Sequence, residues 1–174
     1  MDKKLLVVID YQNDFVTGAL GFSDAKDVEA TIVKLLEEFT ANGDDIVFTK
    51  DTHFANYLET QEGRNLPIIH CIKGTPGHDV HGKPAEYVKD AKKVYEKIAF
   101  GSLEFANDIS KENYSEIVLV GLVTNICIVS QAVLAKTALP EALIKVYKSG
   151  VNSYDKKLHR ETLNVLEGLQ VTVI

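Results

Sequence analysis

The chain has 174 residues, of which 45% are hydrophobic and 25% are charged, and its formal net charge is -6. These values predict one globular domain over residues 1–174, large enough to bury its own core. The lysines and arginines are scattered among acidic residues, and no apolar run is long enough to span a bilayer. We therefore expect neither a nucleic-acid partner nor a membrane partner.

The chain begins with a predicted strand, helix and second strand. Residues 5–10, LLVVID, form an apolar run without alternation, which is typical of a strand buried on both faces of a parallel sheet. Apolar residues at helical spacing predict a helix over 23–41, and NGD at 42–44 is typical of a C-terminal cap. The run DIVFTKD at 45–51 predicts a second buried strand.

The stretch 52–84 interrupts this alternation. It holds four of the five histidines and three of the four prolines. Long irregular loops inside compact domains are usually functional, so we expect this stretch to contribute to a site. Whether it closes as a lid is left open by the sequence.

Strands and helices alternate again through the rest of the chain. We predict strands over 94–98, 117–122, 142–147 and 169–174, and helices over 103–111, 126–139 and 156–166. This order implies right-handed crossovers between parallel strands. The expected fold class is therefore α/β, with a doubly wound, mostly parallel sheet of about five or six strands and helices on both faces.

Several charged or reactive residues follow the ends of predicted strands. Asp10 ends the first strand, Asp51 and His53 follow the second, and Lys97 follows the short run at 94–96. The segment GLVTNIC, 121–127, leads from a central strand into a helix. Ligands of open α/β sheets bind outside the carboxyl ends of the strands, so we expect these residues near one rim.

Cys127 has two interpretations. It lies near the start of a predicted helix, where unpaired N–H groups and the macrodipole favour a thiolate, as a nucleophile requires. Its neighbours Ile126 and Ile128 are apolar, and it could instead share a core with them as an inert thiol. Asp10 and Lys97 would supply a base for the thiol proton and a cation for the thiolate. Each of these two residues also has an ordinary structural explanation, and the spacing leaves both interpretations open.

The two cysteines, Cys71 and Cys127, are too few for a disulfide framework. The first apolar run ends in Asp10 and lacks the small-residue cleavage site of a signal peptide. We expect two free thiols and a cytoplasmic location.

A second group of residues has the chemistry of a metal site. Asp51, His53 and His70 offer one carboxylate and two imidazoles, a suitable first shell for Zn, Fe or Mn. The D-x-H pattern is short and loop histidines are common, so residues without a metal remain the alternative. We expect His78 and His81 to be solvated loop residues.

Five blocks of the sequence, by their order and spacing, resemble the isochorismatase-like cysteine hydrolases and, within them, the nicotinamidase branch. The blocks are IDYQNDF at 9–15, KDTHF at 50–54, IHCIKGTPG at 69–77, EKIAFGS at 96–102 and GLVTNICI at 121–128. The resemblance covers the chain from Leu5 to about Ile174. It implies a small-molecule substrate and a homo-oligomer.

The resemblance implies a role for each matching position. Asp10 resembles the general base of the family, Lys97 the triad lysine and Cys127 the nucleophile. A cis peptide bond between Leu122 and Val123 is also implied. The backbone N–H groups of Val123 and Cys127 would then form an oxyanion hole.

The resemblance also implies a metal. Asp51, His53 and His70 match the ligands with which nicotinamidases hold a divalent ion, here Zn, Fe or Mn, against the pyridine nitrogen of the substrate. The fourth ligand is left open among Glu59, Glu62 and water.

The implied reaction is hydrolysis of a small carboxamide through a cysteine thioester, with nicotinamide giving nicotinate and ammonia for NAD salvage as the first expectation. Burial should raise the pKa of Asp10, while the helix end and Lys97 should lower that of the Cys127 thiol. Another small amide, a carbamoyl compound or an isochorismate-like substrate is the alternative within the family. An idle scaffold with an inert Cys127 is the alternative outside enzymes.

The substrate ring has one expected partner and one missing wall. Phe15 matches an aromatic that packs on the ring in the family, and a core phenylalanine is its alternative. Nicotinamidases often have an aromatic residue shortly before the second metal histidine. This chain has only aliphatic residues and proline there, LPII at 66–69, which leaves one wall of the pocket unaccounted for.

Overall fold

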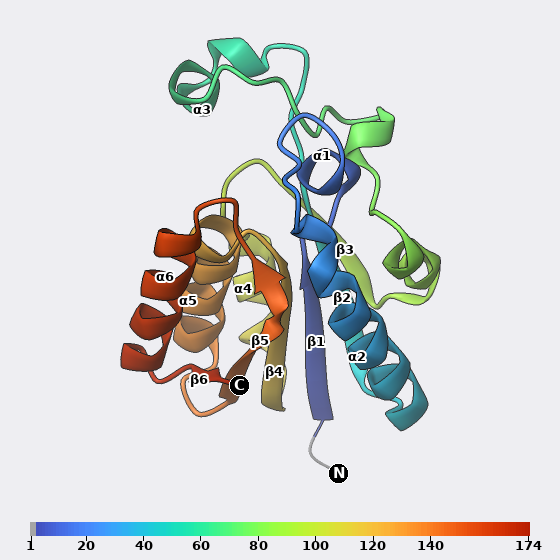
Figure 1. The fold of residues 1–174 in the computed structure, drawn as a ribbon. Coiled ribbons are helices and arrows are strands. Elements are labelled where there is room, and N and C mark those ends of the chain that lie inside the picture. The colour runs from blue at the N-terminus through green and yellow to red at the C-terminus, as the bar shows by residue number, and fades with distance from the viewer. Residues whose placement is uncertain (1–2) are drawn as a thin grey trace.

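A computed structural model describes residues 3–174 as a sheet covered by helices (Figure 1). Its strands are β1 Lys3–Ile9, β2 Asp45–Asp51, β3 Lys93–Lys97, β4 Tyr114–Leu122, β5 Leu143–Asn152 and β6 Thr172–Val173. Its α-helices are α1 Asn13–Val16, α2 Glu29–Asn42, α3 Gln61–Asn65, α4 Leu103–Ile109, α5 Val129–Ala138 and α6 Lys156–Gly168.

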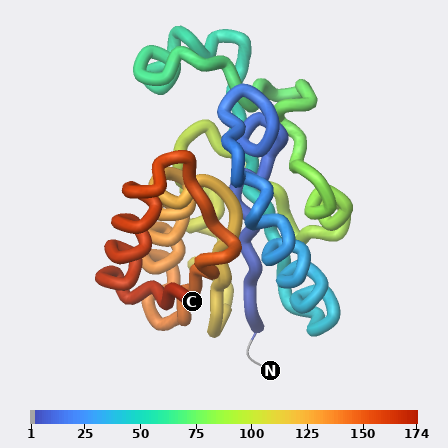
Figure 2. The backbone as a smooth tube through the Cα atoms, in the orientation of Figure 1, coloured from blue at the N-terminus to red at the C-terminus, as the bar shows by residue number. Residues whose placement is uncertain are grey.

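The six strands are all parallel and lie in the order β3-β2-β1-β4-β5-β6. Strand β1 lies inside the sheet, with β2 and β3 on one side and β4, β5 and β6 on the other. This order confirms the predicted doubly wound α/β class. Helices α4, α5 and α6 cover one face and α2 covers the other (Figures 1 and 2). Among residues 3–174, no helix is long and apolar enough to cross a membrane.

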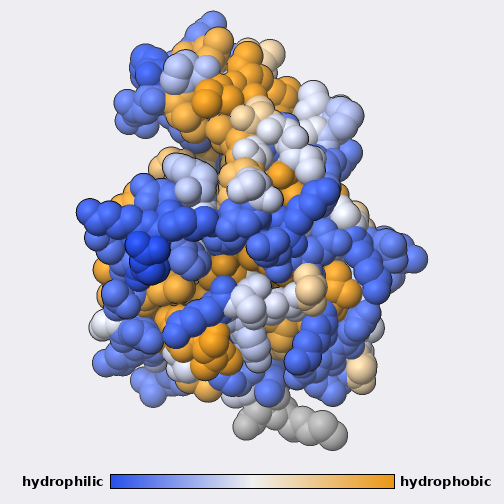
Figure 3. Space-filling view, viewed as in Figure 1, coloured by the Kyte–Doolittle hydropathy of each residue, from blue (hydrophilic) through white to orange (hydrophobic). Residues whose placement is uncertain are grey.

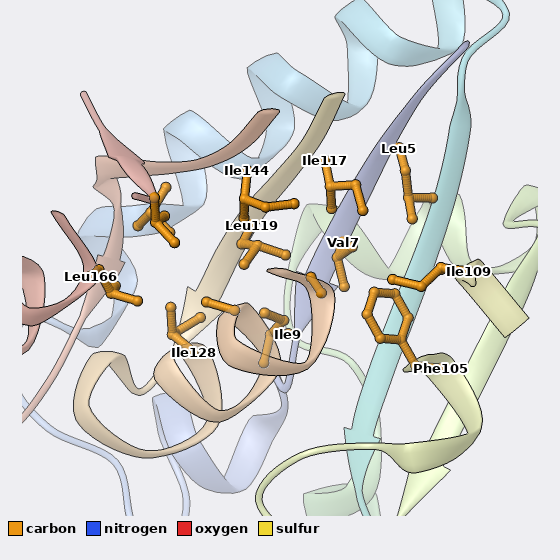
Figure 4. Close-up of a cluster of buried hydrophobic side chains, with 14 of the residues drawn as sticks. Leu5, Val7, Ile9, Phe105, Ile109, Ile117, Leu119, Ile128, Ile144 and Leu166 are labelled. Carbon is orange, nitrogen blue, oxygen red and sulfur yellow. The ribbon is translucent and has the colours of Figure 1, made fainter. Parts of the chain in front are cut away.

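Strand β1 shows why both faces of the sheet are covered. Leu5, Val7 and Ile9 pack into the core under α4 and α5, where Phe105 and Ile128 meet them (Figure 4). The alternate residues of β1, Leu6 and Val8, pack into a second core against α2. Because successive side chains of a strand point to opposite faces, a run without polar alternation fits only a strand buried on both sides.

The registers bring the predicted reactive residues to one rim. Ile9 of β1 lies opposite Thr49 of β2 and Gly121 of β4, and Asp51 lies opposite Lys97. The carboxyl ends of these four neighbouring strands therefore meet at the same edge of the sheet.

The predicted element boundaries differ from the structure in several places. The helix predicted over 23–41 is a 3₁₀ turn at Ala25–Val28 followed by α2, which ends at Gly43 in the left-handed region. The strand predicted over 169–174 shortens to two residues because β6 is an edge strand that pairs only with β5. Strand β5 instead continues to Asn152 along β4.

The irregular stretch 52–84 contains short helices. It includes 3₁₀ turns at Tyr57–Glu59 and Pro76–His78, the helix α3 between them, and the beginning of a longer 3₁₀ segment at Lys83–Asp90. The segment around α3 projects beyond the carboxyl edge of the sheet (Figures 1 and 2). Figure 3 shows hydrophobic residues gathered on this projecting segment, and exposed side chains there include Phe54, Leu58, Ile68 and Ile69.

Candidate active site

Asp10 is fixed by the strand beside it. The residue directly follows β1 with a φ of 47°, in the left-handed region that Asp tolerates better than most residues. Its N–H donates to the Thr49 carbonyl over 3.1 Å, and the Thr49 hydroxyl donates to Oδ1 of Asp10 over 2.6 Å. The side chain is fully buried, so its second oxygen, Oδ2, faces the site rather than solvent.

Lys97 lies between the other charged groups of the rim. Its Nζ is 2.6 Å from Oδ2 of Asp10 and 3.6 Å from Oδ1 of Asp51. The same Nζ is 3.7 Å from Sγ of Cys127 and donates to the Ala99 carbonyl over 3.1 Å. The ammonium therefore contacts the acid and the sulfur at once, although the three residues are far apart in the sequence.

The turn that holds Cys127 begins with a cis peptide bond between Leu122 and Val123, as the family resemblance implied. One wide, π-helical turn over Thr124–Ile128 follows and leads directly into α5. The helix thus begins two residues earlier than predicted, and Cys127 lies in its first turn, almost completely buried.

Three features pack this turn against its surroundings. Gly121 has a φ of 122°, and a Cβ there would lie 2.0 Å from the Ile9 carbonyl oxygen, so only glycine fits between β1 and β4. The hydroxyl of Ser153, after β5, donates to Oδ1 of Asn125 over 2.6 Å. Thr124 shares a 2.8 Å hydrogen bond with Nδ1 of His159 on α6. No sequence pattern predicts these side-chain contacts, because their partners lie on later elements.

The electrostatics of the three residues follow from their burial. Burial raises the pKa of Asp10 above its ordinary value, against the lowering effect of the Lys97 ammonium. Burial alone would lower the pKa of Lys97, but the neighbouring Asp10, Cys127 and Asp51 together outweigh it and the net direction is upward. Lys97 is therefore charged at neutral pH, and Asp10 is a stronger base than an exposed aspartate.

The prediction of a lowered thiol pKa is wrong for the resting protein. Burial raises the pKa of Cys127 well above its ordinary value and outweighs the lowering effect of Lys97, while the neighbouring carboxylates of Asp10 and Asp51 raise it further. The resting sulfur is a neutral thiol, and a base must remove its proton before it can act as a nucleophile.

Four side chains next to this group form a candidate metal site. One ligand atom each from Asp51, His53, Glu62 and His70 lies within 4.8 Å of all the others. Glu62 is on α3, and it belongs to this set whereas Glu59 does not. The structure thus selects between the two glutamates that the sequence left open.

The donor set fits a small divalent cation. Oδ2 of Asp51 is 3.1 Å from Nε2 of His53 and 3.4 Å from Nε2 of His70, and Oε1 of Glu62 is 3.6 and 3.8 Å from the same two nitrogens. A tetrahedral ion with bonds of about 2.1 Å separates its ligands by about 3.4 Å. Nδ1 of His70 lies 2.7 Å from the Ile68 carbonyl, a contact that leaves Nε2 free to bind an ion.

Gln12 and Asp14 hold the backbone of this cluster, a role that the sequence analysis missed. Oε1 of Gln12 accepts the N–H of Asp51 over 2.7 Å, and its Nε2 donates to the carbonyls of Asp51 and His78 over 2.9 and 3.0 Å. Oδ2 of Asp14 accepts the N–H of Cys71, next to His70, over 2.7 Å. Both residues belong to IDYQNDF, and a glutamine soon after the carboxyl end of an uninterrupted apolar strand is the signal that could have identified the first.

The expectation that His78 and His81 are solvated is wrong. His78 is buried and shares a 2.9 Å hydrogen bond with the Thr52 hydroxyl. His81 is half-buried and shares a 2.7 Å bond with Oδ1 of Asn13. The His78 ring joins two parts of the stretch 52–84, and the His81 ring connects the stretch to Asn13, which explains why neither ring is in solvent.

A cavity of about 720 Å³ opens onto both groups of residues. Cys127 and Val123 line it, and so do Asp51, Glu62 and His70 of the candidate metal site. Phe15 also lines it, with the ring centroid 5.7 Å from that of His70. Leu66 and Ile68 form the wall that the sequence left unaccounted for. The arrangement can hold a flat molecule between a nucleophile and a cation site.

The model of the isochorismatase domain matches residues 4–174 of this chain. The chain belongs to the isochorismatase family. An uncharacterized isochorismatase family protein of Bacillus subtilis, PncA, is 34% identical over 93% of both chains.

Two solved structures are similar to this chain over nearly its whole length. The structure of a nicotinamidase/pyrazinamidase of Bacillus subtilis is 31% identical over 98% of both chains, with a TM-score of 0.88. A pyrazinamidase/nicotinamidase of Streptococcus mutans is 29% identical over 99% of this chain and 100% of that one, also with a TM-score of 0.88. The isochorismatase domain thus spans residues 4–174 of this chain.

Proposed function

We propose that this isochorismatase-family hydrolase cleaves nicotinamide to nicotinate and ammonia through a thioester on Cys127. The observation that supports this most directly is the position of the Lys97 ammonium, 2.6 Å from the Asp10 carboxylate and 3.7 Å from the Cys127 sulfur. Cys127 lines a cavity that is also lined by Asp51, Glu62 and His70 of the candidate metal site. The activities named for the relatives from Bacillus subtilis and Streptococcus mutans support the same substrate.

In the first half of the proposed reaction, Asp10 takes the Cys127 proton as the sulfur attacks the carboxamide carbon. The S–C bond forms and the carbonyl π electrons move to oxygen, where the backbone N–H groups of Val123 and Cys127 stabilise the charge. Asp10 then returns the proton to the amide nitrogen, the C–N bond breaks, and ammonia leaves. The product on the protein is a thioester.

In the second half, a water molecule attacks the thioester after ammonia has left. Asp10 accepts a proton from the attacking water and the oxygen–carbon bond forms. The C–S bond then breaks, the carboxylic acid leaves, and Asp10 returns the proton to the sulfur, which restores the Cys127 thiol and the Asp10 carboxylate. The raised pKa of Asp10 suits both halves, because a carboxylate with a higher pKa is a better match for a neutral thiol and for water. Lys97 keeps its charge throughout and stabilises the negative charge as it moves between oxygen and sulfur.

Asp51, His53, Glu62 and His70 are proposed to hold a divalent ion, Zn, Fe or Mn. When bound, such an ion supplies a Lewis acid to which a pyridine nitrogen can attach. The contribution of the protein is to hold the ring edge at these residues while Phe15 packs on the ring face, so that the carboxamide lies over Cys127. This favours an aromatic amide with a ring nitrogen over a carbamoyl compound or a vinyl ether.

The test measures ammonia release from nicotinamide by purified protein supplied in turn with Zn²⁺, Fe²⁺ and Mn²⁺. We expect turnover by the wild type and loss of at least about 10³-fold in Cys127→Ala, which lacks the nucleophile. Cys71→Ala is the matched control, because it removes the other buried thiol without touching Asp10 or Lys97, and it should retain turnover.

No ammonia from nicotinamide with any of the three metals would refute the proposal. A panel of small carboxamides, carbamoyl compounds and isochorismate-like vinyl ethers, run on the wild type and on Cys127→Ala, would then identify another substrate. Inactivity toward the whole panel would favour the idle scaffold.

A further inference from the structure

In the proposed function, the backbone N–H groups of Val123 and Cys127 stabilise the oxyanion, and both belong to the turn that leads into α5. The Val123 carbonyl accepts the N–H groups of Ile126 and Ile128 over 3.1 and 3.2 Å. These bonds join residues of the turn to each other, and contacts with other elements decide how the turn is oriented. Orientation matters because a shift of about 1 Å at a reacting group can cost about 10²-fold in rate.

Thr124 directly follows Val123 and makes one of these contacts with another element. Its side chain is fully buried, and its hydroxyl shares a 2.8 Å hydrogen bond with Nδ1 of His159 on α6. The two residues are 35 positions apart in the chain. Because a buried hydroxyl is costly to leave without a partner, this bond ties the backbone next to Val123 to the position of His159.

The start of α6 holds His159 in place. Oδ1 of Asp155 accepts the N–H groups of Lys157 and Leu158, each over 2.9 Å, and so caps the helix. The Asp155 carbonyl accepts the N–H of His159 over 2.9 Å. The imidazole that contacts Thr124 is therefore mounted on an ordered helix, which positions a side chain more precisely than a loop does.

The His159 ring is neutral at neutral pH. Burial lowers its pKa, and the charges of Lys156 and Arg160 on the same helix lower it further. Asp24, from the segment before α2, acts in the opposite direction but does not outweigh them. A neutral ring has one donor and one acceptor nitrogen, and a hydroxyl can pair with either. A neutral amide at the same place can therefore replace the ring as the partner of Thr124.

The contact between Thr124 and His159 lies outside the cavity. Of residues 3–174, those that line the cavity include Val123 and Cys127 but neither Thr124 nor His159. Any effect of His159 on the reaction must consequently pass through the turn. Such an effect changes the transition state, where the oxyanion forms, more than the binding of the uncharged amide.

We propose that His159 is a positioning residue: its hydrogen bond to Thr124 holds the backbone N–H groups of Val123 and Cys127 in the direction that the tetrahedral intermediate requires. The inference rests on the proposed function. It adds a residue from α6 that belongs to none of the five sequence blocks.

The first test measures kcat and KM for nicotinamide in three variants. We expect His159→Leu to lower kcat by about 10–100-fold and to leave KM within about twofold of the wild type, because it disturbs an interaction made in the transition state. His159→Asn places an amide near the position of Nδ1 and should restore kcat to within about threefold of the wild type. Arg160→Leu is the matched control, because it introduces the same side chain at the next, exposed position of α6, and it should leave kcat unchanged.

The second test removes the same hydrogen bond from its other side. Thr124→Val deletes the hydroxyl with little change in volume and should lower kcat as His159→Leu does. The double variant should be no slower than the slower single variant, because both changes remove one interaction. Thr124→Val with His159→Asn also tests the inference if His159→Leu does not fold.

The outcomes separate the two proposals. Three results in an active wild type overturn the inference and leave the proposed function intact: a kcat within about threefold in both His159→Leu and Thr124→Val, a loss that His159→Asn does not restore, or single losses that multiply in the double variant. No hydrolysis by the wild type with Zn²⁺, Fe²⁺ or Mn²⁺ overturns both. A loss of kcat at constant KM, with rescue by His159→Asn and no further loss in the double variant, supports the inference.

Discussion

The carboxyl edge and the amino edge of the sheet each have a lysine paired with aspartate, but the pair is buried at the first edge and partly exposed at the second. At the carboxyl edge, Lys97 pairs with Asp10 and Asp51, and all three side chains are almost completely buried. At the amino edge, Lys92 pairs with Asp45 and lies 2.8 Å from the Tyr114 hydroxyl, with about 39% of the lysine side chain exposed. Both groups consist of a lysine paired with carboxylates from neighbouring segments, and they differ mainly in their access to water.

The difference in access to water reverses the direction of the aspartate pKa shift between the two edges. It also changes how much each ion pair stabilises the fold. Burial raises the pKa of Asp10, whereas that of Asp45 is lowered, because hydrogen bonds from Lys3, Lys92 and Tyr114 together outweigh its partial burial. A buried ion pair is a poor source of stability, since desolvation offsets much of the attraction. A cluster of this kind at a cavity is better explained by chemistry, and the exposed one by modest stabilisation.

The largest expected effect comes from Lys97→Met. The change leaves two buried carboxylates, Asp10 and Asp51, without the cation between them, and removal of one partner of a buried pair typically costs about 3–5 kcal/mol. We also expect amide hydrolysis to fall by at least about 10³-fold. Urea unfolding and ammonia release measure the two effects.

Lys93→Met is the control for that variant. It makes the same change on the same strand, where the lysine pairs with Glu104 and Asp108 at the surface. We expect a loss of stability of no more than about 1 kcal/mol and no loss of turnover. Equal losses in the two variants would show that burial does not distinguish the two lysines.

A smaller effect is expected for Gln12→Met. The methionine fills a similar volume but leaves the N–H of Asp51 and two carbonyls without their partner, at about 1–3 kcal/mol for each buried group left unsatisfied. Because Asp51 loses its support, Zn²⁺ affinity measured by calorimetry should fall by about 10–100-fold. Gln12→Glu keeps the acceptor for the Asp51 N–H and should lie between the wild type and Gln12→Met. Unchanged Zn²⁺ affinity in Gln12→Met would contradict the positioning role.

The amino edge is tested by Asp45→Asn and acid unfolding. The pKa of Asp45 is lowered in the folded state, so the unfolded chain binds more protons there as pH falls below about 4. The stabilisation is complete above that value and is lost as pH falls through the folded pKa. Asp45→Asn should therefore show a shallower decrease in unfolding free energy below about pH 4, and an unchanged slope would contradict the assignment.

The smallest effect is expected for Lys92→Met. Its pairs with Asp45 and Glu112 are partly exposed, so the loss of stability should not exceed about 1 kcal/mol and should shrink in about 1 M salt. Hydrolysis should be unchanged, because this edge is at the opposite end of the strands from Cys127. A loss comparable to that of Lys97→Met would remove the contrast between the two edges.

The sequence was sufficient for the fold class because the hydrophobic pattern is strong and local. The uninterrupted runs at 5–10 and 45–51 match β1 and β2 closely, and both strands are buried on two faces. The hydrophobic pattern does not predict the structure of a segment whose length or burial depends on partners far away in the chain. The extent of β6 depends on how far β5 pairs with it, and the burial of His78 depends on Thr52 and on the fold of the stretch 52–84.

For the site, residue identities along the chain were enough to nominate Asp10, Lys97, Cys127 and the ligands Asp51, His53 and His70, because each follows a strand end or belongs to a recognisable block. The choice of Glu62 over Glu59, the support from Gln12 and the neutral state of the resting thiol came from the folded arrangement. Hydrogen-bond partners and desolvation are set by groups dozens of residues away in the chain, and a linear pattern does not specify those distances.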